Sequence, residues 1–171
     1  MRRRILTAAL LLLAVGLANL AAQDAAAPTS AYTSGRYSFT LQAPTFDALG
    51  AGRAGVIAAF SAPAEEGFAA NMSVMIQQIS MTRDDYKAVL IGGIEKAGLT
   101  INRSDTLKVG PHDALRLDYQ GTLDQRDLRF LALAVVEKNR VVLVTCKSLQ
   151  KNFAKYEAAF KAALDSYQPA P

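Results

Sequence analysis

His112 is the only histidine in the chain and the first residue to consider for catalysis. A Ser-His-Asp triad needs an imidazole base that is held in place by a separate carboxylate. Asp113 follows His112 directly in the segment Gly110-Pro111-His112-Asp113, and a neighbour in the same turn is poorly placed for that task. Metal sites built on histidine usually need more than one imidazole. We therefore interpret His112 as a turn residue and predict neither a catalytic triad nor a zinc site.

Two pairs of carboxylates, Asp84 with Asp85 and Asp124 with Asp127, are the candidates for calcium binding. Calcium can be held by carboxylates alone, but neither pair has the one-three-five spacing or the trailing glutamate of a calcium loop. We interpret the first pair as a helix cap and the second as part of a hairpin turn. No metal is predicted.

The segment 50–55 reads GAGRAG and looks like a dinucleotide-binding motif in outline. That motif needs a strand-turn-helix context, whereas a second strand is expected to begin at Val56. The segment is better interpreted as a mobile loop between two strands. The sequence thus predicts no cofactor and no catalytic residue, and the protein is expected not to be an enzyme.

The charge and cysteine content exclude further classes of protein. The chain has 171 residues, with 19 Lys and Arg against 15 Asp and Glu; without Arg2, Arg3 and Arg4 the balance falls to 16 against 15. Such a near-neutral chain lacks the strong positive electrostatic potential of a nucleic-acid-binding protein, so no nucleic-acid partner is expected. The single cysteine, Cys146, excludes an internal disulfide and lies in the apolar run VVLVTC, which predicts a buried, inert thiol.

The N-terminus has the order of a secretory signal peptide. Met1–Arg4 is positively charged, Ile5–Leu20 is apolar, and small residues follow at Ala21 and Ala22. We predict a signal peptide over 1–22, cleaved before Gln23, and a periplasmic or extracellular protein. The alternative is an uncleaved membrane anchor, since the apolar stretch is close to the length that spans a bilayer. In that case the membrane would be contacted only through this segment.

The rest of the chain reads as a short linker and one domain. Residues 23–34, QDAAAPTSAYTS, are small and polar with no apolar period, which predicts a flexible linker. Residues 35–168 contain no internal repeats and no change in amino-acid composition that would mark a second domain. The segment is long enough to form one hydrophobic core. A single domain over 35–168 is expected.

Period-two and helical patterns define the elements of this domain. Extended segments are predicted at 37–43, 56–60, 72–79, 99–109, 114–123, 128–137 and 141–146. A helix capped by Thr82 is predicted to end at Gly98, and a long amphipathic helix follows Ser148, a possible N-cap. The short connections favour antiparallel hairpins. The predicted fold class is α+β, a mainly antiparallel sheet of six to seven strands flanked by a mid-chain helix and a long C-terminal helix.

Several motifs in this order carry a family resemblance. They are Tyr37-Ser38-Phe39-Thr40-Leu41-Gln42-Ala43-Pro44, Phe60-Ser61-Ala62-Pro63, Asn71-Met72-Ser73-Val74, Tyr119-Gln120-Gly121, Thr145, and Phe153, Tyr156, Phe160, Leu164 and Ser166-Tyr167. Over residues 35–168 the chain resembles the PsbP-like superfamily, and within it the bacterial DcrB-type secreted proteins. It departs from the family after Pro44, where a tryptophan is usual and this chain has none.

The resemblance implies a PsbP-like sandwich, but the roles in this family diverge. Plant members assist a photosystem, bacterial members are envelope accessory proteins, and a nuclear branch binds a small GTPase; the signal segment argues against that branch. Fold transfers more safely than function. Our first hypothesis is a non-enzymatic accessory protein of the cell envelope with an envelope protein as partner.

Two loops are candidates for the binding edge because packing does not explain their composition. One is 45–55 with the lone cation Arg53, and the other is 65–70, where we expect Phe68 to be an apolar anchor. The alternative is that Phe68 packs into the core. A second hypothesis is a binder of a small apolar or amphiphilic ligand between helix and sheet, with Met72, Met75 and Met81 as adaptable lining.

Overall fold

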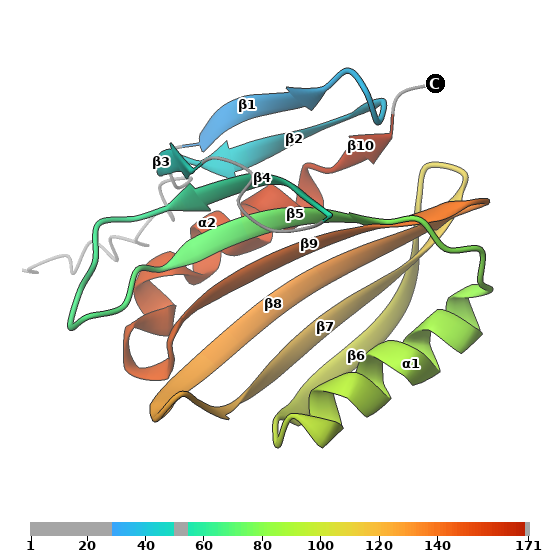
Figure 1. Cartoon of the computed structure of the whole chain (residues 1–171). Coiled ribbons are helices and arrows are strands. Elements are labelled where there is room, and N and C mark those ends of the chain that lie inside the picture. Colours follow the sequence, from blue (N-terminus) through green and yellow to red (C-terminus); the bar gives the residue numbers. More distant parts are fainter. Residues whose placement is uncertain (1–28, 50–54, 170–171) are drawn as a thin grey trace, which may run out of the picture.

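The structure is a computed structural model that describes residues 29–49 and 55–169 (Figure 1). Its elements, in chain order, are β1 (Thr29–Ser34), β2 (Phe39–Pro44), β3 (Asp47–Leu49), β4 (Val56–Ser61), β5 (Asn71–Gln77), α1 (Arg83–Lys96), β6 (Thr100–Val109), β7 (His112–Leu123), β8 (Arg126–Glu137), β9 (Arg140–Leu149), a 3₁₀ turn (Gln150–Asn152), α2 (Phe153–Asp165) and β10 (Gln168–Pro169). The predicted α+β fold class is confirmed.

The strands form two antiparallel sheets. The large sheet has the order β3-β4-β5-β9-β8-β7-β6, and the small one has the order β1-β2-β10. Strands β6 to β9 follow one another as hairpins, as their short connections predict. In the β7–β8 turn Asp124 and Gln125 have φ angles of 49° and 63°, which is the type I′ geometry that suits the twist of a hairpin. The interpretation of Asp124 as a turn residue is therefore confirmed.

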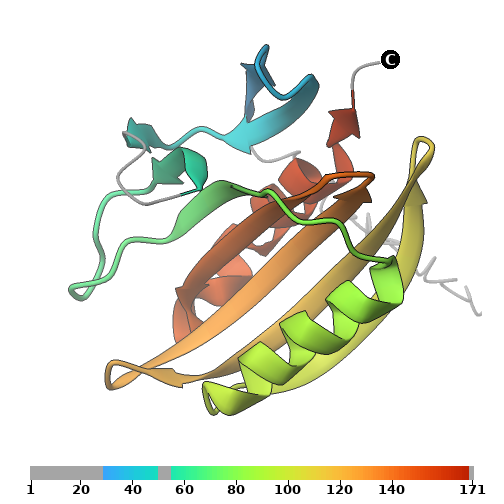
Figure 2. The ribbon, with the colours of Figure 1, turned by 45° about the vertical axis from the view of Figure 1, so that its right-hand side comes forward.

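The two faces of the large sheet are covered differently. On one side, here called the α2 face, α2 and strand β2 share a single hydrophobic core with strands β4, β5, β8 and β9. On the other side, the α1 face, helix α1 contacts β6 and β7. Figure 2 shows α1 in front of this end of the sheet and α2 behind it.

Aromatic side chains fill the core on the α2 face. Phe153 and Phe160 of α2 and Phe39 of β2 are all at most 1% exposed. Phe39 stacks on Tyr167 with ring centroids 5.1 Å apart, and Phe160 lies 5.9 Å from the ring of Tyr156. The apolar stripe predicted for the C-terminal helix is thus buried along its length, and Cys146 is buried on the same face, as predicted.

The first helix begins where its capping signal predicts. The Thr82 hydroxyl accepts a hydrogen bond from the Asp85 amide at 3.1 Å and donates one to the Asp85 carboxylate at 2.7 Å. Asp84 and Asp85 lie in the first turn, where acidic side chains suit the positive end of the helix dipole. The predicted cap at the start of this helix is confirmed.

Two expectations are wrong. Residues 29–34 were expected to belong to a flexible linker, but they form β1, which pairs with β2 from Thr29 opposite Pro44 to Ser34 opposite Phe39. Tyr32 stabilises this strand because its ring lies 5.7 Å from that of Phe60.

The second wrong expectation is the N-cap of the last helix. Ser148 is the penultimate residue of β9, and its hydroxyl donates to the Leu149 carbonyl at 3.1 Å. Helix α2 begins five residues later, after the 3₁₀ turn, without a side-chain cap. Strands β3 and β10 were not predicted because they have three and two residues.

The predicted signal peptide over 1–22, the first part of the linker and Arg53 lie outside the described residues. Within the described residues, no helix combines the length and the apolar character needed to cross a membrane.

Candidate functional site

Helix α1 covers its face of the sheet incompletely. Tyr86 and Ile94 are the buried residues of this helix, while Val89 is 59% exposed and Leu90 is half-buried. The sequence stripe that predicted this helix therefore points only partly at the sheet. A helix that is held by few side chains leaves apolar surface accessible beside it.

An apolar groove of about 660 Å³ runs between α1 and the sheet. Its walls come from the end of β5 and the following segment, from α1, and from β7 and β8 (Gln77, Gln78, Ile79, Met81, Tyr86, Val89, Leu90, Gly93, Ile94, Ala97, Leu99, Tyr119, Leu123 and Phe130). None of these residues is acidic or basic. We call this hollow the α1 groove.

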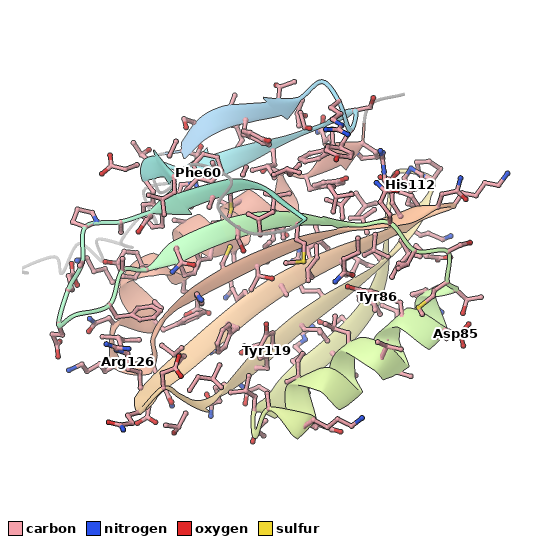
Figure 3. All side chains as sticks on the ribbon, in the orientation of Figure 1. Phe60, Asp85, Tyr86, His112, Tyr119 and Arg126 are labelled. Carbon is pink, nitrogen blue, oxygen red and sulfur yellow. The ribbon has the colours of Figure 1, made fainter. Side chains whose placement is uncertain are left out.

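Two stacked rings form the floor of the α1 groove. Tyr119 of β7 lies opposite Phe130 of β8 in the ladder, and their rings are 4.6 Å apart and nearly parallel, at 3°. Burial raises the pKa of the Tyr119 hydroxyl, so the ring is neutral at physiological pH. Figure 3 shows Tyr86 and Tyr119 on the side of the sheet that α1 covers.

The groove is polar at one end and apolar at the other. At the start of α1 the Tyr86 hydroxyl donates to Gln77 Oε1 at 2.7 Å, and burial raises the pKa of Tyr86 to about 12. Gln78 lines the same end, whereas Leu99 and Leu123 line the other. This arrangement provides uncharged hydrogen-bonding groups next to a long apolar surface.

Exposed apolar side chains mark the rim of the groove. Val89 is 59% exposed and Met81 is 40% exposed. Methionine adapts its shape to different partners, and solvent-exposed apolar groups beside a hollow are typical of binding surfaces.

Met72, Met75 and Met81 do not share one pocket, contrary to the second hypothesis. Met72 is fully buried in the core of the α2 face because it belongs to the inward-facing set of β5. Met75 points to the opposite face and lines a different hollow, next to β4. Only Met81 lies on the α1 groove.

The hollow beside β4 also lies on the α1 face and has a volume of about 510 Å³. Leu49 and Val56, which flank the segment 50–54, line it together with Phe68 and Met75. The described ends of the two predicted binding loops thus border one hollow, while Arg53 is outside the described residues. Phe68 is the only predicted site residue that can be placed.

Phe68 is half-buried and closes a tight turn. Its amide and carbonyl pair with those of Glu65 at 3.0 and 2.9 Å, and its ring packs against the cluster around Tyr119 and Phe130. Glu65 pairs with Lys155 of α2, and the next carboxylate, Glu66, pairs with Lys151. The turn is therefore fixed to the C-terminal helical segment, and part of the Phe68 ring is accessible.

A charged hollow of about 320 Å³ lies on the α2 face, over β6, β7 and β8. Arg129 donates two hydrogen bonds to Asp118, at 3.1 and 2.7 Å, and Arg116 pairs with Asp165 at 2.5 Å. Burial alone would raise the pKa of Asp118, but the hydrogen bonds from Arg129 and Asn102 outweigh it and lower that pKa. The cations of this hollow are matched by carboxylates, so it offers no unbalanced charge to a ligand.

The described part of the chain contains no group of three or more His, Cys, Asp and Glu side chains that could hold a metal. His112 is the first residue of β7, and Asp113 pairs with Lys108 at 2.9 Å and not with the imidazole. Figure 3 shows His112 at the opposite end of the sheet from Arg126.

Sequence reasoning missed most of the α1 groove. Tyr119 and Phe130 have the sequence pattern of core residues, and their exposed fractions of 8% and 5% agree with that pattern. The groove arises because α1 sits over them only in part. The signal that points to it is Val89, an apolar residue that widens the helical stripe beyond what the sheet can cover.

No protein-family model matches this chain, and no curated protein matches it. Solved structures do. PA94 of Pseudomonas aeruginosa, a protein of unknown function, has 22% identity and a TM-score of 0.62 over 84% of this chain and 98% of its own. Cyanobacterial PsbP (CyanoP) from Synechocystis sp. PCC 6803 has 14% identity and a TM-score of 0.60, covering 84% and 93%. The fold of this chain is PsbP-like.

A third solved structure has the same fold. LpqN of Mycobacterium tuberculosis, which is involved in cell envelope biogenesis, has 11% identity and a TM-score of 0.64, covering 84% of this chain and 91% of its own. The resemblance predicted from the sequence is confirmed at the level of the fold. At these identities the likeness carries the PsbP-like fold and not the function.

Proposed function

We propose that this protein is a non-enzymatic accessory protein of the cell envelope that binds another envelope protein through its α1 face. The observation that carries the proposal is the α1 groove, an apolar surface with no charged lining residue. The envelope location is supported by the signal-like N-terminal sequence and by the likeness to LpqN, which serves envelope biogenesis in its own organism.

The shape of the groove favours a macromolecular partner. Sites for small molecules are concave and bury most of the ligand. The α1 groove is open along its rim, where Val89 and Met81 are exposed. An apolar segment of another protein can lie along such a groove with Val89 at the contact.

A charge placed on the rim tests this proposal. Val89→Glu introduces a carboxylate that binding would have to desolvate, and the matched control is Ala158→Glu on the exposed side of α2. Partner capture from envelope extracts, with a photoreactive residue at Met81, should fall at least about tenfold with Val89→Glu and stay unchanged with Ala158→Glu. Equal capture by the wild type and both variants would overturn the proposal.

Export is tested separately. Purified periplasmic or secreted protein should begin at Gln23, because 1–22 has the features of a cleaved signal peptide. Mass spectrometry that finds Met1 retained would replace the processed protein by a membrane-anchored one.

A second candidate function is binding of a small uncharged amphiphile in the same groove. The observation that favours it is the polarity of the groove, with Gln77, Gln78 and Tyr86 at one end and Leu99 and Leu123 at the other. Titration with a monoacylglycerol, which is an uncharged single-chain amphiphile, followed by native mass spectrometry, should give a one-to-one complex that Val89→Glu weakens. An unbound mass at all ligand concentrations would exclude this function.

A further inference from the structure

Strand β6 is an open edge of the large sheet. It has ten residues, Thr100–Val109, and in the described part of the chain it pairs only with β7. The other edge, β3, has three residues. An edge strand presents unpaired backbone N–H and C=O groups, and proteins usually blunt such edges with charges or bulges. Strand β6 carries charged side chains and a bulge, but the order of its charges would favour pairing with a second copy.

The centre of β6 is complementary to itself. Two copies that pair antiparallel about a two-fold axis at Ser104 place Arg103 of each copy opposite Asp105 of the other. Opposite charges that lie directly across an antiparallel pair stabilise it, and like charges destabilise it. The axis generates two such attractive pairs.

Other registers lack this match. An axis at Asp105 places the two Asp105 carboxylates opposite each other, and an axis at Arg103 places the two Arg103 guanidinium groups opposite each other. Both arrangements are repulsive. An axis at Thr106 places Asp105 opposite Leu107. The β-bulge between Ile101 and Arg103 ends the regular strand on the N-terminal side, so the matched residues are the centre of a short pairing. The charges thus select one register and reject its neighbours.

The two charged side chains at the centre of β6 are accessible to a second copy. Arg103 is 74% exposed and Asp105 is 39% exposed, and within the chain they form a lateral ion pair at 2.6 Å. The Ser104 hydroxyl is buried without a hydrogen-bond partner in the chain. At the axis, rotation about χ1 would bring the two serine hydroxyls of a pair toward each other, and Ser–Ser hydrogen bonds occur across strands.

We propose that the protein forms a weak, salt-sensitive homodimer by antiparallel pairing of β6 with β6 of a second copy, centred on Ser104. Because the axis is perpendicular to the sheet, the two α1 grooves lie on the same side of the joined sheet. A dimer of this kind would present both grooves to one partner and raise its apparent affinity.

Charge exchange tests the dimer without destroying the fold. Sedimentation velocity is measured on the purified protein at about 100 μM, a concentration far above the dissociation constants of tight complexes. It should show dimers that dissociate as the salt concentration is raised. Arg103→Asp and Asp105→Arg each create two like-charge pairs and should raise the dissociation constant at least about tenfold. The control, Arg126→Asp in the β7–β8 hairpin, carries the same change of net charge as Arg103→Asp and should dimerise like the wild type.

The decisive step is mixing. Arg103→Asp and Asp105→Arg, each monomeric alone, are complementary to each other and should form a heterodimer, and the double variant should regain the homodimer. Circular dichroism and urea midpoints establish that each variant is folded. A monomeric wild type at this concentration overturns the proposal. So does a dimer that persists in both single variants, or a mixture that stays monomeric.

Discussion

Helices α1 and α2 cover opposite faces of the same sheet, and they do so to very different extents. Helix α2 buries six side chains of its 13 residues, with Phe153 and Phe160 at most 1% exposed. Helix α1 buries two of its 14, Tyr86 and Ile94, and leaves Val89 mostly in solvent. The contrast indicates that the α2 face holds the fold together and that the α1 face is available for binding.

The difference follows from sequence. Helix α2 carries a continuous aromatic and aliphatic stripe, whereas α1 contains Gly92 and Gly93, each of which lowers helix stability by about 1 kcal/mol relative to alanine. Neither glycine is forced by a close approach, because a Cβ at either position would meet nothing within 4 Å. The pair therefore lowers the stability of α1 without allowing a closer approach to the sheet.

The largest expected effect lies on the α2 face. Phe160→Ala should lower the free energy of unfolding by about 3–5 kcal/mol, since it empties a fully buried site. Urea denaturation measures this loss. A loss below about 1 kcal/mol, as for surface residues, would mean that α2 is peripheral and that the comparison between the helices is wrong.

A smaller loss is expected at the buried position of α1. Ile94→Ala should cost about 2 kcal/mol, at the low end for such changes, because the loosely held helix can settle into the space. The same urea experiment applies. If Ile94→Ala costs as much as Phe160→Ala, the two helices are equally well packed.

The N-terminal cap of α1 should contribute less to the free energy of unfolding than Ile94 does. Thr82→Ala removes the hydroxyl that accepts from the Asp85 amide and should lower stability by about 1 kcal/mol. Thr82→Ser keeps the hydroxyl and serves as the control. Equal stability of wild type, Thr82→Ala and Thr82→Ser would show that α1 does not depend on its cap.

The smallest effect on stability is expected on the rim of the groove. Val89→Ala should change the free energy of unfolding by less than about 0.5 kcal/mol, because Val89 is mostly exposed. A loss of several kcal/mol would place Val89 in a packed contact and remove it from the binding surface.

The sequence predicts most of this fold because its patterns are local. Alternation in 37–43 and the Thr82 capping signal each depend on a few neighbouring residues, and the structure confirms both. Strand β1 could not be predicted in this way, because its sequence, TSAYTS, has the composition of a linker. The strand is stabilised by contacts of Tyr32 with Phe39 and Phe60, which local sequence does not show.

The candidate site is harder to predict because it depends on tertiary placement. Tyr119 lies in an alternating strand pattern and Phe130 begins an apolar run, and both patterns are those of core strands. Only the partial cover by α1 turns the two rings into the floor of a groove. Of the two loops chosen from composition alone, the described residues Leu49 and Phe68 line a different hollow on the α1 face. Phe68 borders the neighbouring hollow, and its role in binding stays a prediction.

Native-state hydrogen exchange tests the contrast between the two faces most directly. Amides in the middle of α1, from Tyr86 to Ile94, should exchange through a local opening whose free energy lies at least about 2 kcal/mol below that of global unfolding. Amides in α2, from Tyr156 to Leu164, should exchange only on global unfolding. If both helices exchange with the same free energy, the α1 face is as firmly closed as the α2 face, and the binding surface proposed for it is wrong.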